Sequence, residues 1–227
     1  MSEQRPLIMC GPSGIGKTTL KNMLVSKYEG YFGFSVSHTT RKPRDGEVDG
    51  EDYHFVAKEK IMKMIKDGQF VEYAHVHKNV YGTSIQAVRS VMKQNKICIL
   101  DIDIQGVKSI LNGPAHAELN PHYLFVQPKS FGDLEARLRK RKSDSEEQIQ
   151  IRVATARKEL EASKSVPFEK FLTNDVLEDA YNEFEEFMLE RYPVLNKKGR
   201  TGQKAARQVG LGAVALLVAL KLASCMF

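Results

Sequence analysis

The residues whose spacing most directly indicates chemistry form one octapeptide, Gly11-Pro12-Ser13-Gly14-Ile15-Gly16-Lys17-Thr18. It fits the pattern G-x-x-x-x-G-K-[ST], in which backbone N–H groups of a glycine-rich loop surround nucleotide phosphates. We expect the ammonium group of Lys17 to reach the β- and γ-phosphates and the hydroxyl group of Thr18 to ligate Mg²⁺. A helix beginning at this loop would direct its positive end at the same anion.

A strand and a helix must flank this loop if it is to bind phosphate. Residues 6–10 form a short apolar run, which predicts a buried strand, and residues 18–28 have apolar side chains at helical spacing. A second hydrophobic run, residues 97–103, ends in carboxylates. Its Asp101 is placed to hold Mg²⁺ through water, although a strand-end aspartate that caps the next helix would have the same sequence.

The remaining apolar patterns predict alternating strands and helices. Further strands are expected at residues 34–37, 53–56, 70–76, 123–126 and 169–173, and further helices at 58–68, 85–94, 107–111, 130–141, 145–163 and 177–192. Turns or loops are expected at 30–33, 38–47, 79–83 and 112–121. This alternation predicts an α/β fold with a parallel sheet and right-handed crossovers.

Composition limits the remaining classes of function. The 227 residues are 42% hydrophobic and 27% charged, with a net charge of +6, which suits a globular protein that binds phosphorylated nucleotides. We find neither an aromatic-plus-basic RNA motif nor zinc-finger spacing, so we do not expect nucleic-acid binding. The three cysteines, Cys10, Cys98 and Cys225, are far apart and indicate no disulfide framework. The N-terminus runs straight into the first strand, so we expect no signal peptide.

Several long motifs then occur in order: GPSGIGKTTL, FGFSVSHTTRKPRDGEVDGEDYHF, VYGTS, CILDIDIQGVKS and the pair Asn174-Asp175. Over about residues 6–192 the chain resembles guanylate kinases, the nucleoside monophosphate kinases that make GDP from GMP and ATP. The resemblance implies a P-loop NTPase core with a five-stranded parallel sheet, an inserted GMP-binding subdomain and a mobile lid. It divides a kinase domain, residues 1–195, into core (1–36, 94–128 and 166–195), GMP-binding part (37–93) and lid (129–165).

The resemblance also implies roles for individual residues. Arg41, Arg44, Tyr53 and Tyr81 resemble the residues that hold the GMP phosphate, through guanidinium forks and phenolic hydroxyls. Glu72 and Asp103 resemble the carboxylates that accept from guanine N1–H and its 2-amino group, while Ser37 and Thr83 resemble hydroxyls near the purine. Without the resemblance, each of these residues also has an ordinary structural explanation. Glu72 could lie on a solvated face of a strand, the arginines could serve solubility, and the tyrosines could be half-buried core residues.

The donor side is implied in the same way. ATP is expected to contact residues 11–18, Thr19 and the pair Asn174 and Asp175, which resemble residues beside adenine. Mg²⁺ is the implied cofactor, held by Thr18 and, through water, by Asp101. Catalysis is assigned to Lys17, Arg44 and two lid arginines, Arg141 and Arg152; Arg137 ranks lower, near the base or on the helix surface. No strong general base is needed, because the attacking phosphate oxygen is already an anion.

Two other functions fit parts of the sequence. A small GTPase would share the P-loop and the D-x-x-G of residues 103–106, but no N-K-x-D motif is present, since residues 95–98 read N-K-I-C. A non-catalytic guanylate-kinase-like module that binds phosphopeptides would typically have a damaged P-loop and adjoining PDZ or SH3 modules. The intact Gly16-Lys17-Thr18 favours an enzyme that binds ATP and GMP, and we expect it to be a monomer.

The chain continues beyond the region of resemblance. Residues 196–208 are basic and predict a linker, and residues 209–227, VGLGAVALLVALKLASCMF, are almost wholly apolar. This length approaches the ~20 residues needed to span a bilayer. Lys221 could extend to the interface, and the preceding positive charges would face the cytosol. We therefore expect a cytoplasmic enzyme that is tail-anchored to a membrane, with an extra docked helix or a disordered extension as the alternatives.

Overall fold

The computed structural model describes residues 4–76, 78–140 and 144–196. Its main sheet has five strands in the order β2-β7-β1-β8-β9, and every neighbouring pair is parallel. The strands are β1 (Leu7–Cys10), β2 (Phe32–Gly33), β7 (Ile97–Asp101), β8 (His122–Gln127) and β9 (Lys170–Thr173). The prediction of an α/β fold with a five-stranded parallel sheet is confirmed.

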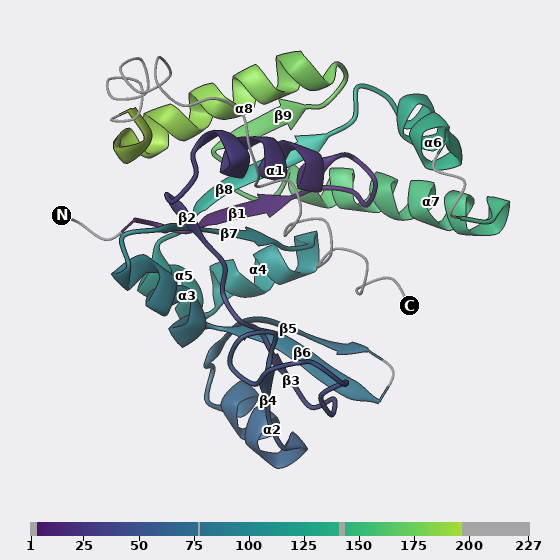
Figure 1. Ribbon diagram of the computed structural model, residues 1–227. Coiled ribbons are helices and arrows are strands. Elements are labelled where there is room, and N and C mark those ends of the chain that lie inside the picture. The colour runs from purple at the N-terminus through teal and green to yellow at the C-terminus, as the bar shows by residue number, and fades with distance from the viewer. Residues whose placement is uncertain (1–3, 77, 141–143, 197–227) are drawn as a thin grey trace.

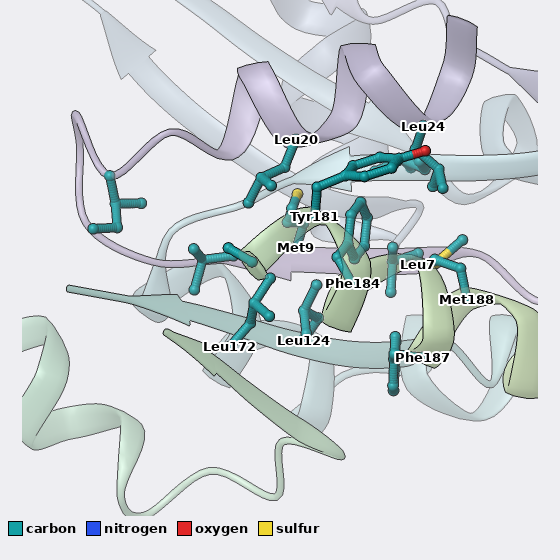
Figure 2. Close-up of a cluster of buried hydrophobic side chains, with 14 of the residues drawn as sticks. Leu7, Met9, Leu20, Leu24, Leu124, Leu172, Tyr181, Phe184, Phe187 and Met188 are labelled. Atoms are coloured by element: carbon teal, nitrogen blue, oxygen red, sulfur yellow. The ribbon is translucent and has the colours of Figure 1, made fainter. Parts of the chain in front are cut away.

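The central strand β1 is buried on both faces, as a parallel strand covered by helices must be. Its side chains alternate: Leu7 and Met9 enter one apolar cluster, and Ile8 and Cys10 enter another. Helices α1 (Lys17–Lys27) and α8 (Leu177–Arg191) cover the first face (Figure 1), where Phe184 packs within the cluster of Figure 2. Helices α3 (Ile85–Lys93), α4 (Ile104–Asn112) and α5 (Pro114–Leu119) cover the second face.

A second, smaller sheet lies apart from the first (Figure 1). Its strand order is β4-β3-β6-β5, with β3 parallel to β4 and antiparallel to β6, and β5 antiparallel to β6. The strands are β3 (His38–Thr39), β4 (His54–Phe55), β5 (Phe70–Val76) and β6 (Asn79–Ser84), and α2 (Lys58–Lys66) packs on them. Ile61, Phe70 and Val80 form a small separate core, which lets this unit fold around its own apolar centre.

Two helices extend from the end of the main sheet toward which β1 points (Figure 1). They are α6 (Phe131–Lys140) and α7 (Glu146–Ser163), and each packs one side against the cluster that includes Leu134, Leu138, Ile149 and Val153. α7 begins with a capping box: Ser145 Oγ accepts from the Gln148 N–H, and the Gln148 side chain accepts from the Ser145 N–H. A one-turn 3-10 helix, Pro193–Leu195, follows α8.

Three local predictions were wrong. The strand expected at 34–37 is replaced by two short pairings, β2 on the edge of the main sheet and β3 in the second sheet. The turn expected at 79–83 is strand β6; Gly82 is needed there because a Cβ atom would lie 2.8 Å from Glu72 O. The loop expected at 112–121 contains α5, whose Gly113-Pro114 start is a common helix N-terminus.

Two sequence predictions concern features that are only partly described. Cys10 and Cys98 are buried with free thiols, as expected for cysteines inside strands, whereas Cys225 lies outside the described residues. Among the helices of the described residues, none has the length and apolar character needed to cross a membrane. The segment 209–227, on which the tail-anchor prediction rests, falls outside that search, as does most of the basic segment 196–208.

Candidate active site

The phosphate-binding loop follows β1 directly and ends at α1. Gly11, Gly14 and Gly16 all have positive φ, at 143°, 85° and 101°, a region that favours glycine. Space excludes side chains as well: a Cβ atom on Gly11 would lie 2.1 Å from Val126 O, and one on Gly16 would lie 2.5 Å from Asn174 Nδ2. The loop conformation therefore depends on these glycines.

Lys17 is folded back over the loop. Its Nζ atom donates to Gly11 O at 2.6 Å and to Pro12 O at 3.2 Å, and it lies 3.5 Å from Asp101 Oδ1. Thr18 and Thr19 are exposed on the first turn of α1. The structure thus brings the Lys17 cation to the Asp101 carboxylate at the end of β7, and Thr18 follows Lys17 on α1.

Asn174 supports this loop from behind. Its side chain is 4% exposed, and its Nδ2 atom donates to Ile15 O at 2.7 Å. Its backbone N–H donates to Gln127 O, which ties it to β8. The resemblance placed Asn174 beside adenine, and the contact with the loop is one that sequence reasoning missed.

Replacing Asn174 by alanine is expected to destabilise the protein, because Ile15 O would become a buried acceptor without a donor. Such a loss costs about 1–3 kcal/mol in the free energy of unfolding. Denaturant unfolding measures this, with Asn182→Ala on the exposed face of α8 as the control, where we expect a change within about 0.5 kcal/mol. Equal stability of the two variants would contradict this supporting role.

A cavity of about 360 Å³ adjoins the loop on the α6 side. Its lining includes Gly14, Thr19, Arg137, Asn174, Asp175 and Leu177. Arg137 Nη2 donates to Asp175 O at 2.7 Å, and Asp175 Oδ2 accepts from Lys129 Nζ at 2.8 Å. Arg137 therefore lines the cavity beside the loop, and its place near the nucleotide base stays a prediction.

A carboxylate pair lines a second cavity, of about 570 Å³, between the two sheets. Glu72 comes from β5, and Asp103 caps the N-terminus of α4 by accepting from Gly106 N at 2.7 Å. Asp101 lies in the same lining. A register shift between Phe70 and Glu72 marks a β-bulge in β5, a feature that often re-aims a side chain near a functional site.

The charge of Glu72 is held in an unfavourable environment. Burial raises its pKa, and the nearby negative charge of Asp103 raises it further, while hydrogen bonds from Thr83 oppose the shift. Thr83 Oγ1 also lies 3.2 Å from Ser37 Oγ. The four residues that the resemblance grouped around guanine, Ser37, Glu72, Thr83 and Asp103, therefore come from four elements or loops toward one region.

A basic and aromatic cluster lies on the loop between β3 and β4. The Arg41 guanidinium lies 5.5 Å from the centre of the Tyr53 ring, and the Tyr53 and Tyr81 rings are 6.0 Å apart. Hydrogen bonding to Glu47, and more weakly to Tyr81, raises the pKa of Arg41. Arg44 is exposed, and its backbone N–H donates to Glu47 Oε2 at 2.6 Å. The sequence analysis did not single out Glu47. The one signal for it was an acidic residue three positions after Arg44 in a polar loop.

One of the two lid arginines approaches the phosphate loop. Arg152 Nη1 donates to Ser13 Oγ at 3.2 Å, and Arg152 Nη2 lies 3.2 Å from Asp144 Oδ1. The other, Arg141, lies outside the described residues. A larger cavity, of about 730 Å³, between α2, α3 and α5 contains none of the predicted site residues, so size alone does not locate the site.

Comparison with known proteins gives the family. The family model described as "Guanylate kinase" matches residues 3–191. The chain belongs to the guanylate kinase family. It is 49% identical over 186 residues to "Guanylate kinase 1" of Oryza sativa subsp. japonica, covering 82% of this chain but only 48% of that protein. It is 45% identical over 203 residues to "Guanylate kinase" of Homo sapiens, covering 89% of this chain and 100% of that protein.

A comparison with solved structures finds the same fold in a guanylate kinase. A guanylate kinase from Anaplasma phagocytophilum has a solved structure with a TM-score of 0.53 and 24% identity, covering 85% of this chain and 88% of that one. At this identity the likeness shows a shared fold. The family match counts against the small-GTPase alternative, which the missing N-K-x-D motif had already made weak.

Proposed function

We propose that this chain is an ATP:GMP phosphotransferase, which moves the γ-phosphoryl group of ATP to the phosphate of GMP, and also of dGMP, giving ADP and the nucleoside diphosphate. One observation carries the proposal: the cavity of Glu72 and Asp103 also contains Asp101, the carboxylate 3.5 Å from the P-loop lysine. The site that we propose for guanine is thus continuous with the site that we propose for the triphosphate of ATP.

The acceptor site would select guanine by charge and hydrogen bonding. Guanine presents two donors, N1–H and the 2-amino group, where the carboxylates of Glu72 and Asp103 offer only acceptors. Adenine has no donor at N1 and lacks the 2-amino group. The hydroxyls of Ser37 and Thr83 would lie beside the ring, and Arg41, Arg44, Tyr53 and Tyr81 would bind the acceptor phosphate.

On the donor side, residues 11–19 would surround the phosphates of ATP. Lys17 now donates to two loop carbonyls, and its Nζ would exchange them for the β- and γ-phosphate oxygens. Hydroxyl and carboxylate oxygens suit Mg²⁺, so Thr18 and, through water, Asp101 would hold the ion. When bound, Mg²⁺ would neutralise charge on the β- and γ-phosphates. Asn174 and Asp175 would flank the nucleotide, with Asn174 acting through the loop.

Transfer would rely on positioning and charge rather than on a base. The acceptor oxygen is already anionic, so this chain needs to bring two polyanions together in line. Lys17, Arg44, Arg141 and Arg152 would balance the charge, and the contact of Arg152 with Ser13 supports its place above the loop. Closure of residues 129–165 over the core, with residues 37–93 moving as the acceptor-binding part, would exclude water and limit ATP hydrolysis.

The other candidate is a phosphopeptide-binding module without catalysis. Such a module has no use for a loop whose three glycines have positive φ and whose lysine faces a strand-end carboxylate. The retained geometry therefore supports an enzyme. The experiment is a steady-state assay of GDP formation from GMP and ATP with Mg²⁺; we expect turnover, and phosphopeptide binding without turnover would support the module.

We propose further that the enzyme is a cytoplasmic monomer anchored to a membrane by residues 209–227. This rests on composition: the segment is apolar, carries only Lys221 as a charge, and follows a basic stretch. It also lies beyond the family match, which ends at residue 191. We expect the full chain to sediment with membranes and a chain ending at Lys204 to stay in the supernatant. Equal partitioning of the two would refute the anchor.

A further inference from the structure

Glu47 contacts both arginines of the loop that is proposed to bind the acceptor phosphate. Its carboxylate accepts from Arg41 Nη2 at 2.8 Å and from Arg41 Nη1 at 3.0 Å, a bidentate pair. One of its oxygens also accepts from the backbone N–H of Arg44 at 2.6 Å. Its own backbone N–H donates to Arg44 O at 3.1 Å, which closes the turn. A single side chain therefore holds the Arg41 guanidinium and the backbone of Arg44, the two arginines that are proposed to meet the GMP phosphate.

The contacts leave Arg41 able to bind an anion. Glu47 uses only the edge of the guanidinium formed by Nη1 and Nη2, and a guanidinium carries five N–H donors around its plane. Nη1 also donates to Lys42 O at 2.8 Å, and Tyr81 interacts with the guanidinium, whereas no hydrogen bond from Nε is found within the part of the chain that the structure describes. Tyr53 and Tyr81 lie on the same side of the loop, with the Tyr53 ring 5.5 Å from the Arg41 Cζ atom. Glu47 thus orients the fork without consuming all of its donors.

The charges and the burial of Arg41 and Glu47 indicate that their contact is stable. Hydrogen bonds from Arg41, and then from the Arg44 backbone, lower the pKa of Glu47, so the carboxylate is ionised at neutral pH. The Arg41 and Glu47 side chains are only 17% and 20% exposed, although their loop is polar. Holding a long, flexible arginine in one geometry before the ligand arrives lowers the ordering cost of binding.

We infer that Glu47 is a positioning residue for the acceptor phosphate: it orients the Arg41 guanidinium and the Arg44 backbone so that a nucleoside monophosphate meets both. This inference rests on the proposed function, because it concerns the same acceptor site. It assigns no contact between Glu47 and the substrate. The alternative is that Glu47 competes with the phosphate for Arg41, in which case removing it would strengthen GMP binding.

The test compares Glu47→Gln with Glu51→Gln in the full chain. Glu51 is an exposed acid four residues later in the same loop, so both variants lose one negative charge at nearly the same place. For Glu47→Gln we expect the KM for GMP to rise about tenfold or more, the loss of a charge-assisted hydrogen bond. The KM for ATP and the melting temperature should stay at wild-type values, and Glu51→Gln should match the wild type throughout.

Two further measurements separate positioning from a general structural role. Guanosine lacks the phosphate, so its inhibition constant against GMP should be the same in Glu47→Gln and in the wild type. In an Arg41→Ala background, Glu47→Gln should raise the KM for GMP little further, since the group it orients is gone. Glu47→Asp, which keeps a carboxylate, should recover part of the affinity.

The outcomes that overturn the inference are distinct. A lower KM for GMP in Glu47→Gln would show competition, and an unchanged KM would show that Glu47 does not act on the phosphate. An equal rise in the inhibition constant of guanosine would assign Glu47 a general structural role. If the wild-type chain does not phosphorylate GMP, the proposed function itself fails, and the inference fails with it.

Discussion

Replacing Lys17 by alanine is expected to lower kcat by at least about a hundredfold, with little change in thermal stability. The ammonium group is the cation that would contact the phosphates throughout the transfer, and removing one such preorganised donor costs on the order of 3 kcal/mol in the transition state. Among the described residues, this group contacts two loop carbonyls and Asp101, so its loss should leave the fold intact.

The measurement is kcat at saturating ATP and GMP together with the melting temperature. Lys21→Ala is the matched control, since Lys21 lies one turn further along α1 and its substitution removes the same charge. We expect near-normal turnover in that control. Near-normal turnover in purified Lys17→Ala would contradict the assignment of the P-loop to ATP.

Replacing Glu72 by glutamine is expected to weaken GMP binding by about one to two orders of magnitude. The amide of glutamine keeps one acceptor but adds donors that would face guanine N1–H or its 2-amino group, and a hydrogen bond to a charged group contributes about 1.5–3 kcal/mol. The effect should fall on the KM for GMP, while the KM for ATP stays constant, because Glu72 lies in the acceptor cavity. An unchanged KM for GMP would remove Glu72 from the guanine site.

Substrate and pH provide internal controls for the same variant. Inosine monophosphate lacks the 2-amino group, so the preference for GMP over it should shrink in Glu72→Gln.

Burial and Asp103 raise the pKa of Glu72, so on acidification this carboxyl should protonate at a higher pH than an ordinary glutamate. The wild-type KM for GMP should therefore rise as pH falls through that raised pKa. Glutamine does not titrate, so the variant should lose this dependence.

The sequence predicted the core of the fold better than its periphery. Residues 7–10 and 97–100 are buried, and continuous apolar runs of this kind are typical of central parallel strands. The short strands Phe32–Gly33 and His38–Thr39 were missed because two residues are too few to show a periodic pattern. Strand β6 was misread because Gly82, which suggests a turn, is required instead by close approach to β5.

The same distinction applies to the candidate site. Lys17 and Asp101 could be predicted from motifs, because local patterns place Lys17 at the end of the loop after β1 and Asp101 at the end of β7. The loop contact of Asn174 could not, since it joins segments 159 residues apart, and Glu47 was missed because its contacts lie within an irregular loop that no periodicity describes. The register shift beside Glu72 could not be predicted either, because it appears only in the pairing of β5 with β6.

The central claim is that a P-loop phosphotransferase reads guanine on its acceptor. The most direct measurement is kcat/KM of the purified full chain with ATP and Mg²⁺ against GMP, dGMP, AMP and UMP as acceptors. We expect GMP and dGMP to be phosphorylated, and AMP and UMP to be poorer by about a hundredfold or more, because adenine lacks both donors that Glu72 and Asp103 would accept from and uracil offers a single N–H on a smaller ring. Comparable turnover of AMP, or no turnover of GMP, would contradict this account.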